Sequence, residues 1–541
     1  MDSGWLTTIL ILLPVAGALV VWILPLRPFW VGSTALLFAL AEIAVWIDAF
    51  ARYDFSKHGP QLDQKTSWFT VFDDVKVSYH VGLYGFSIWL VGLTVVVLAA
   101  AIAYAFWAGR DKAEAYYGLM LLLTGAIVGV FVAQDLLLFY VFWEAMLIPL
   151  YFLIGVWGGA GRLRATLVFV IYTMAGSLLM LAAIIALGFS QGTFDMVGTG
   201  TNGSDWIFLG FVAAFAVKAP LFPFHGWLPE TYRESSPEVA AVLSGVISKA
   251  AAFGFLRIVI AKFPGPSVDF RIPILVLAGC GLVYGSLLAF RAPDVRGVIA
   301  YSSLAQMGLI TFGLFAINDL GLNGAVLQMV NHGLISASLF LLAGGIERRT
   351  STGELDRLGG MARGRPVLAT VLMALGVMAL AVPGSSAFAG EFAILAGVFQ
   401  TGWGWAVVGA IAIVLAAMYM LRLISAVLHK SPGAAVSDAA LDLRPAELGI
   451  LGPLLACLLV LSFWPAAITE RSFTLSRSQA EIELAASAGH LPTTLCANGL
   501  SAPARRALLK LGIKLVQSPD CQSQAGALGA LSSQSFRSVL P

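Results

Sequence analysis

Long apolar stretches separated by short polar ones make up most of the chain. A helix needs about 20 consecutive apolar residues to cross a bilayer core. Fourteen stretches reach or approach that length, and they are residues 6–26, 30–50, 82–107, 115–133, 135–157, 165–188, 206–229, 239–262, 272–290, 295–315, 322–345, 367–399, 405–428 and 447–468. This pattern predicts an all-α, polytopic membrane protein with about 14 transmembrane helices. No basic leader or small-residue cleavage site precedes the first stretch, so we interpret it as a retained helix.

The composition agrees with a membrane protein, because 59% of the 541 residues are hydrophobic and only 11% are charged. A soluble domain has roughly 25% charged residues. The loops opposite the termini contain fifteen Lys and Arg residues. The loops on the termini's side contain six, which are Arg52, Lys57, Lys65, Lys76, Lys262 and Arg271. Since cytoplasmic loops carry the excess of positive charge, we expect both termini on the outer side.

Motifs for nucleotides and metals are missing from the sequence. It contains no GxxxxGK[ST] and no GxGxxG between a strand and a helix. The four cysteines, at positions 280, 457, 496 and 521, show no CxxC spacing that would suggest an iron–sulfur or zinc site. The net charge of +2 gives no indication of nucleic-acid binding.

Five ionisable residues fall deep inside predicted spans: Glu144, Lys218, Lys249, His332 and Glu391. A charge at the bilayer centre costs about 2.5–3.5 kcal/mol on insertion scales, so such residues are functional candidates by default. Simpler roles are possible for some of them. Glu144 and Lys218 could form a static ion pair, and His332 could be a satisfied core histidine.

Arg257 and Lys262 also lie within or at the end of a predicted span. Both are near enough to its end for their side chains to snorkel to the membrane interface. We therefore interpret these two cations as interfacial rather than functional.

Two of the predicted spans contain residues that break helices. Pro220 and Pro223 follow Lys218, while Pro383 and Gly384 precede Glu391. Proline has no backbone N–H, so it interrupts a helix, and broken helices mark the ion site in many transporters. The breaks fall in spans seven and twelve, five helices apart. This spacing predicts two five-helix repeats, spans four to eight and nine to thirteen, of the inverted kind that transporters use.

The predicted spans divide the chain into five parts. They are 1–114 (helices 1–3 with an outer loop at 51–81), 115–262 (first repeat), 272–428 (second repeat), 429–468 (linker and helix 14) and 469–541 (an extramembrane tail).

Several of these segments carry a family resemblance. "LLLFYVFWEAMLIPLYFLIGVWG", "KAPLFPFHGWLPE", "SGVISKAAAFGFLRI", "RGVIAYSSLAQMG", "NHGLISASLFLLAGGIERR" and "PGSSAFAGEF" resemble the antiporter-like chain M (mitochondrial subunit 4) of respiratory complex I, the proton-pumping NADH:quinone oxidoreductase. The resemblance runs from about residue 80 to residue 430. Within the wider antiporter-like group, "FWEAMLIP" and a Glu at position 391, where the sister chains L and N typically have Lys, favour chain M.

The resemblance implies a role for each buried charge. Glu144 and Lys218 would form a switching ion pair, Lys249 would be the central proton carrier, His332 would connect the half-channels, and Glu391 would be the terminal group towards the outside. It also implies that other membrane subunits are partners, notably two sister antiporter-like chains on either side. NADH, FMN, iron–sulfur clusters and quinone would be bound by partner subunits, with no cofactor on this chain. The location would be an energy-coupling membrane such as the bacterial plasma membrane.

The sequence departs from this family at three positions. Gln306 stands where many relatives have His, Val168 where relatives often have Lys, and Tyr232 where His is frequent. An amide can hold water but cannot titrate, so His332 and water must carry the link past Gln306. Tyr232 puts in doubt any proton uptake at its loop.

Two other functions compete with proton pumping in complex I. A subunit of a multi-subunit Mrp-type sodium/proton antiporter shares the Lys218 and Lys249 pattern, and a scaffold would only space other subunits. The long "FWEAMLIP" match argues against the antiporter. The complete set of buried charges argues against the scaffold.

The tail has no counterpart in the family, so only local chemistry applies to it. Its segment "APARRALLKLGIKLV" has apolar residues at helical spacing and four cations, which predicts a short amphipathic helix on a membrane or subunit surface. A Cys496–Cys521 disulfide would close the loop around it. The alternative is a disordered tail with two free thiols.

Overall fold

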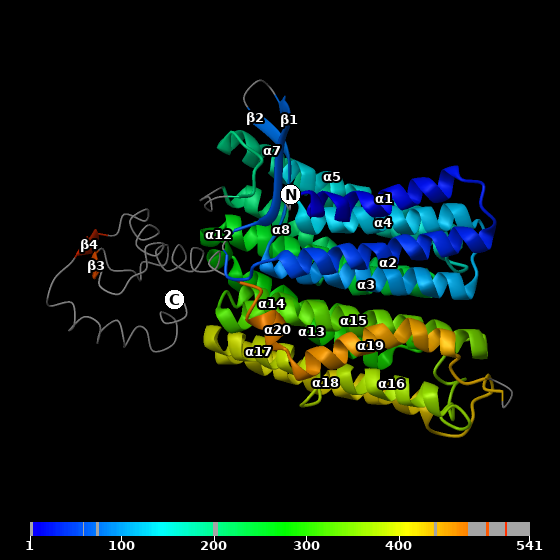
Figure 1. The fold of residues 1–541 in the computed structure, drawn as a ribbon. Helices are drawn as coiled ribbons and strands as arrows, with labels where there is room; N and C mark the ends of the chain where they lie inside the picture. The colour runs from blue at the N-terminus through cyan, green and yellow to red at the C-terminus, as the bar shows by residue number, and fades with distance from the viewer. Residues whose placement is uncertain are drawn as a thin grey trace.

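The structure is a computed structural model that describes residues 4–57, 59–71, 75–197, 204–437, 441–473, 494–496 and 514–516. Most of it is a bundle of long helices that run side by side (Figure 1). The first half contains α1 (Trp5–Ile23), α2 (Pro28–Arg52), α3 (Gly85–Ala108), α4 (Ala113–Val132), α5 (Leu136–Ala145), α6 (Leu147–Trp157), α7 (Arg162–Gln191), α8 (Asp205–Lys218), α9 (Leu228–Glu234), α10 (Pro237–Val242), the π-helix η1 (Leu243–Ile247), α11 (Ser248–Gly254) and the π-helix η2 (Phe255–Ile260).

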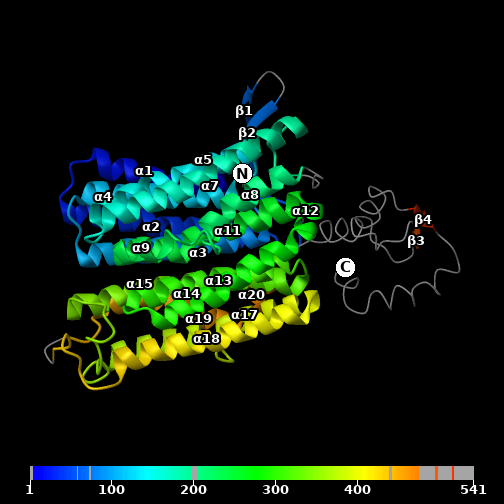
Figure 2. The same cartoon turned by 180° about the vertical axis from the view of Figure 1, so that it is seen from behind.

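The second half contains α12 (Pro264–Asp269), α13 (Arg271–Arg291), α14 (Val295–Phe315), α15 (Asp319–Thr350), α16 (Pro366–Ala379), α17 (Ser386–Thr401), α18 (Trp403–Leu428), α19 (Pro445–Phe463) and α20 (Ala466–Thr469). Figure 2 shows this half from behind, with α18 along its outer edge. The mostly helical membrane fold that the apolar pattern predicts is confirmed.

Twelve helices in the described residues are long and apolar enough to cross a membrane. The two other predicted spans are interrupted. In one, α8 ends at Lys218 and α9 begins only at Leu228; in the other, α16 ends at Ala379 and α17 begins at Ser386. Both interruptions contain the prolines that predict them, because a proline cannot donate the next helical hydrogen bond. The total of fourteen spans and the inversion of the two repeats stay predictions.

Two irregularities in the helices were not anticipated from the sequence. Met146 separates α5 from α6. In a continuous helix the carbonyl oxygen of Ala145 would accept a hydrogen bond from the N–H of residue 149. That residue is Pro149, which has no N–H, so the bond is missing. The span that carries Lys249 has π-helical turns on both sides of α11. Such turns often occur at functional sites, but no periodicity in the sequence marks them.

The predicted outer loop at 51–81 is a β-hairpin for much of its length, which departs from the all-α expectation. Strand β1 (Gln61–Val71) pairs antiparallel with β2 (Val75–Leu83). Figure 1 shows this hairpin at the same end of the bundle as the N-terminus and α12.

The tail prediction is wrong where the structure describes it. Residues Lys514–Val516, the end of the predicted amphipathic helix, form strand β4, which pairs in parallel with β3 (Thr494–Cys496). Backbone pairing there replaces the expected helical bonds. The rest of that helix and the predicted disulfide partner Cys521 lie outside the described residues.

The core of the molecule lies around α15 and the segment from α10 to η2. The most apolar stretch of each of these two segments is buried completely by the rest of the protein. In α1, α2, α7 and α18, less than half of the residues in the corresponding stretch are buried. Peripheral helices therefore present apolar side chains outward, as a membrane environment requires. The central helices carry Lys249 and His332.

Candidate functional site

Glu144 and Lys218 lie at the first interruption of the bundle. Asp135 caps α5 by accepting hydrogen bonds from the N–H groups of Leu137 and Leu138, at 2.9 and 3.2 Å, so the helix that carries Glu144 has a defined start. Lys218 is the last residue of α8 and is 3% exposed. Its Nζ lies 4.0 Å from the centre of the Trp143 ring, next to Glu144 in the chain.

This cation–π contact is what the structure has in place of the expected direct ion pair between Glu144 and Lys218. An aromatic face attracts an ammonium group, most strongly where water is excluded. Trp143 is held by Phe139 and Phe215, with ring centroids 5.5 and 5.4 Å away. Glu144 is still near enough for its charge to act on Lys218. In this structure the Lys218 ammonium therefore rests on the Trp143 ring and not on the Glu144 carboxylate.

Lys249 and His332 form the centre of the site. Lys249 Nζ lies 2.7 Å from His332 Nδ1, 2.5 Å from the carbonyl oxygen of Ser244 and 3.3 Å from Ser248 Oγ. These three acceptors match the three N–H groups of an ammonium. When Lys249 donates to Nδ1, the proton of a neutral imidazole sits on Nε2, on the far side of the ring. The geometry thus orients His332 to pass a proton onward.

Two glycines allow Lys249 and His332 to meet. A Cβ on Gly333 would lie 2.7 Å from the carbonyl oxygen of Gly245, and one on Gly245 would lie 3.1 Å from the carbonyl oxygen of Gly333. The η1 and α15 backbones are therefore in direct contact. Small residues permit such close packing between membrane helices.

Glu391 lies across a small cavity from His332. The cavity has a volume of about 20 Å³, and both side chains line it with Gln306, Gln328 and Tyr419. About 10–15 Å³ is enough to hold one water molecule. His332 Nε2 is buried and has no hydrogen-bond partner among the described residues. A water in this cavity could therefore connect Nε2 to the Glu391 carboxylate.

Gln306 contacts the terminal acid directly. Its Nε2 donates to Glu391 Oε1 at 2.8 Å, and its Oε1 accepts from Gln328 Nε2 at 2.9 Å. The amide therefore orients Glu391 and holds the cavity wall, but it has no proton to exchange. Gln328 was not identified from the sequence, because a single amide in an apolar helix gives a weak signal.

A cluster of buried hydroxyls lies beside Lys249 and was also missed. Ser244 Oγ is 2.7 Å from Ser303 Oγ and forms a short hydrogen bond with Ser336 Oγ. The Tyr232 hydroxyl lies near Ser244 without making a hydrogen bond of normal geometry to it. One signal was available: Ser336 is four residues after His332, so the two share a helix face.

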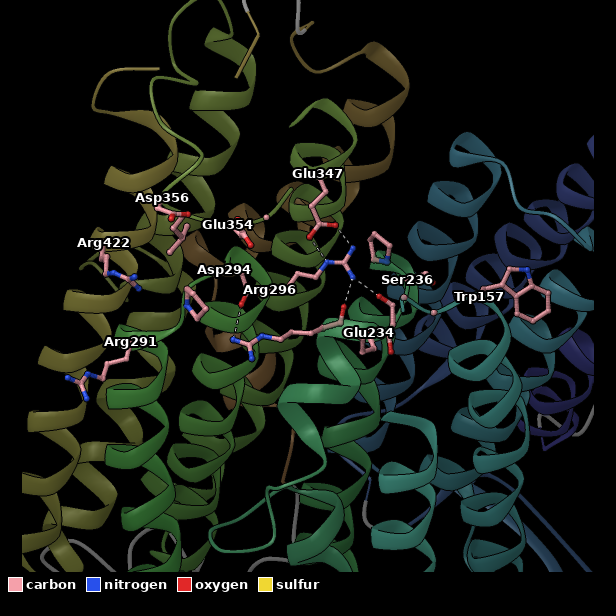
Figure 3. A pocket seen from close by; sticks show the side chains of 18 of the residues that line it. Trp157, Glu234, Ser236, Arg291, Asp294, Arg296, Glu347, Glu354, Asp356 and Arg422 are labelled. Carbon is pink, nitrogen blue, oxygen red and sulfur yellow. Dashed lines mark hydrogen bonds and ion pairs between the residues drawn. The ribbon is translucent and has the colours of Figure 1, made fainter. Parts of the chain in front are cut away.

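A much larger charged cavity opens close to these hydroxyls. Its volume is about 920 Å³, and Arg233, the neighbour of Tyr232, lines it. Figure 3 shows Arg296 at its centre, bound to Glu347 and reaching the 233–236 segment. Arg296 Nη1 donates to the carbonyl oxygens of Arg233 and Ser235 at 3.1 and 2.6 Å, and Arg233 pairs with Asp294 at 2.8 Å.

Arg257 and Lys262, which we interpret from the sequence as interfacial, are 7% and 3% exposed. Arg257 Nη2 donates to Tyr84, Gln134 and the Met196 carbonyl oxygen at 2.9–3.1 Å. These partners lie outside the helix ends, since Tyr84 precedes α3, Gln134 follows α4 and Met196 follows α7. The guanidinium is held there by the protein, and its Nε has no hydrogen-bond partner among the described residues. The interfacial position of the two cations stays a prediction.

Four buried ionisable side chains, Lys218, Lys249, His332 and Glu391, together with the partly exposed Glu144, lie in a bundle with two interrupted spans. This arrangement is typical of an ion-translocating membrane protein of the antiporter type. Residues 133–416 match the family model described as NADH:quinone oxidoreductase/Mrp antiporter, TM. NADH-quinone oxidoreductase subunit M of Mycobacterium tuberculosis (strain H37Rv) is 35% identical over 517 residues, which cover 86% of this chain and 92% of the relative. NAD(P)H-quinone oxidoreductase chain 4 3 of Trichormus variabilis is 36% identical over 490 residues, covering 87% and 90%. The chain belongs to this family of subunit M and chain 4 proteins.

Solved structures agree with this assignment. Respiratory complex I from Thermus thermophilus contains a chain that superposes with a TM-score of 0.79 at 29% identity, covering 88% of this chain and 99% of that one. A chain of the Mrp complex from Dietzia sp. gives 0.73 at 22% identity, covering 89% and 99%. The second likeness shows a shared fold only.

Proposed function

We propose that this chain is the proton-translocating membrane subunit of a complex I-type NADH:quinone oxidoreductase. The observation that carries the proposal is the contact between Lys249 Nζ and His332 Nδ1 at 2.7 Å, which continues through a water-sized cavity to Glu391. A protonatable chain of this kind inside a membrane protein has no evident structural purpose. The relatives' names support the enzyme complex to which it belongs.

In the proposed cycle, the position of Lys218 controls the proton on Lys249. When Lys218 pairs with Glu144, Lys249 holds its proton. When redox energy from partner subunits breaks the pair, Lys218 moves towards Lys249, and repulsion between the two ammonium groups favours release of the Lys249 proton. The contact of Lys218 with Trp143 supports this idea because it is a second resting place for the same ammonium.

The proposed route begins at the large charged cavity on the inner side. Protons pass from this cavity by Tyr232 and the Ser244 cluster to Lys249, and Tyr232 serves as a hydroxyl link where relatives often use His. His332 accepts the proton on Nδ1 and releases another from Nε2 through water to Glu391. Glu391 then releases it to the outer side. Moving one charge against 100 mV costs about 2.3 kcal/mol, which the repulsion between two buried ammonium groups can supply.

The same proposal covers partners and location. Two sister antiporter-like chains flank this subunit in the bacterial plasma membrane, and both termini face outward. NADH, FMN, the iron–sulfur clusters and quinone are bound by other subunits. Among the described residues, no group of three or more His, Cys, Asp or Glu is placed to hold a metal ion.

The Lys249→Ala and Lys249→Met variants test the relay, because Met keeps most of the side-chain volume. We expect both complexes to assemble with normal NADH:ferricyanide activity, while proton pumping and quinone reduction fall several-fold. Arg164→Gln is the matched control, since Arg164 is a cation whose side chain is 81% exposed and it pairs only at the surface. Normal pumping by both Lys249 variants would reject the relay.

An Mrp-type antiporter remains the second candidate, because the matching family model includes both groups. Pumping measured with and without sodium separates them. We expect proton uptake that is independent of sodium and requires quinone reduction. Proton movement driven by a sodium gradient without a quinone reaction would favour the antiporter.

A further inference from the structure

A sixth acid lies inside the membrane part of the protein, away from the relay. Glu42 is on α2 (Pro28–Arg52), fourteen residues after its start and ten before its end. At 1.5 Å per residue these separations are about 21 and 15 Å. Glu42 is therefore near the middle of a span, too deep for a short carboxylate to reach either interface.

The side chain of Glu42 points into the protein. Glu42 is 1% exposed and shares its helix face with the buried Ala35, Ala39 and Ala49, while Leu40 and Ile47 on the other face are 53% and 55% exposed. This buried face packs against α1, α3 and α4. Glu42 is therefore held within the N-terminal helices and not turned towards lipid.

Neither carboxylate oxygen of Glu42 has a hydrogen-bond partner among the described residues, and no cation there forms an ion pair with it. Trp46, one turn away, donates to the Ile88 carbonyl oxygen at 2.9 Å, and Thr94 and Thr124 on the facing helices donate within their own helices. Glu391 differs in this respect, because Gln306 and Gln328 both donate to it.

An ionised carboxylate cannot persist in such a place. An unpaired buried charge costs far more than an unpaired neutral polar group, so the group takes up a proton instead. Arg52 on the same helix is bound to Asp48 at 2.9 Å and lies more than two turns away. The surroundings of Glu42 therefore provide nothing to stabilise a negative charge.

We propose that Glu42 is a proton-binding site separate from the relay and that its side chain remains a neutral carboxylic acid at physiological pH. The proton takes the place of the cation or hydrogen-bond donors that a buried carboxylate would otherwise need.

Infrared difference spectra of the intact complex test the protonation state. The spectrum of the wild type minus that of Glu42→Gln, recorded at pH 6 and pH 9, should show loss of a carboxylic C=O band at both values. Glu470→Gln is the matched control, because Glu470 is an exposed glutamate and should show loss of carboxylate bands. Loss of carboxylate bands in Glu42→Gln would overturn the proposal.

Coupled proton pumping by Glu42→Gln should equal that of the wild type, whereas a several-fold fall would place Glu42 in the relay and reject its separate role. This outcome is distinguishable from failure of the relay proposal, which depends on the Lys249 variants.

Discussion

At the scale of single residues, the narrowest point of the proposed route is His332, because its neighbour Gln306 cannot titrate. We predict that His332→Ala lowers coupled proton pumping several-fold and that adding Gln306→His to it restores part of the loss. The second imidazole would line the same cavity and touch Glu391, as Gln306 does at 2.8 Å. Proton pumping by membrane vesicles, with NADH:ferricyanide activity as the assembly control, measures both effects.

The comparison requires that Gln306→His alone leaves pumping near the wild-type level. Relatives with His at this position make such a substitution chemically reasonable. If the double variant pumps no better than His332→Ala, protons reach Glu391 by a route that avoids this cavity.

At the scale of the elements, the contact between η1 and α15 positions the relay. We predict that Gly333→Ala lowers pumping and destabilises the protein by roughly 1–3 kcal/mol, the usual cost of overpacking. The new Cβ would lie 2.7 Å from the Gly245 carbonyl oxygen and would separate Lys249 from His332. Thermal unfolding of the purified complex and vesicle pumping measure the two effects.

Gly452→Ala is the control for this substitution, because Gly452 is also in a helix but a Cβ there would meet nothing within 4 Å. It should be neutral or stabilising by about 0.5–1 kcal/mol. Equal behaviour of the two variants would mean that the backbone contact does not position the relay.

We predict that the stability of the β-hairpin against the helix bundle depends on pH. His80 on β2 lies 2.8 Å from Asp63 Oδ1 and 3.2 Å from Asp195 Oδ2. Burial opposes protonation of the imidazole, but the close contact of Nδ1 with Asp195, the hydrogen bond of Nε2 to Asp63 and the two negative charges outweigh burial and raise the pKa of His80 to about 9. Because this pKa is raised above the ordinary value of about 6.5, the stabilisation is fully present below pH 6.5 and is lost as pH rises through 9.

Hydrogen exchange of residues 75–83 measures this stabilisation. We expect slow exchange at pH 6 to 8 and faster exchange above pH 9, after correction for the intrinsic rate. His80→Gln should exchange faster at pH 7 and lose the transition near pH 9. A pH profile unchanged by this substitution would contradict the role of His80.

At the scale of the whole molecule, the orientation in the membrane determines the direction of pumping. We predict that Trp68→Cys on the β-hairpin is labelled by an impermeant maleimide in intact cells, while Arg363→Cys, between α15 and α16, is labelled only after permeabilisation. Both positions are exposed. The four native cysteines should first be replaced by serine. The reverse labelling pattern would place both termini inside and reverse the proposed route.

The membrane fold and the choice of five candidate relay residues follow from the sequence alone, and the physical reason is the cost of polar groups in a bilayer. Long apolar stretches had to be spans, charges within them had to be functional candidates, and Pro220 and Pro383 had to interrupt helices. The same reasoning was available for Glu42, which lies in a predicted span. It had not been singled out, because no motif surrounds it.

Only the tertiary structure decided which of these groups meet. Lys249 and His332 are 83 residues apart, and their contact depends on the close approach of the η1 and α15 backbones at Gly245 and Gly333. Lys218 lies on the Trp143 ring because the α8 break brings the end of one helix against another. Arg257 is buried because Tyr84, Gln134 and Met196 converge on it from distant segments. The cost of burying a polar side chain in a bilayer depends on its residue type, so it can be assigned to each position from the sequence. A contact between distant segments exists only once the helices have packed, so it cannot be assigned in this way.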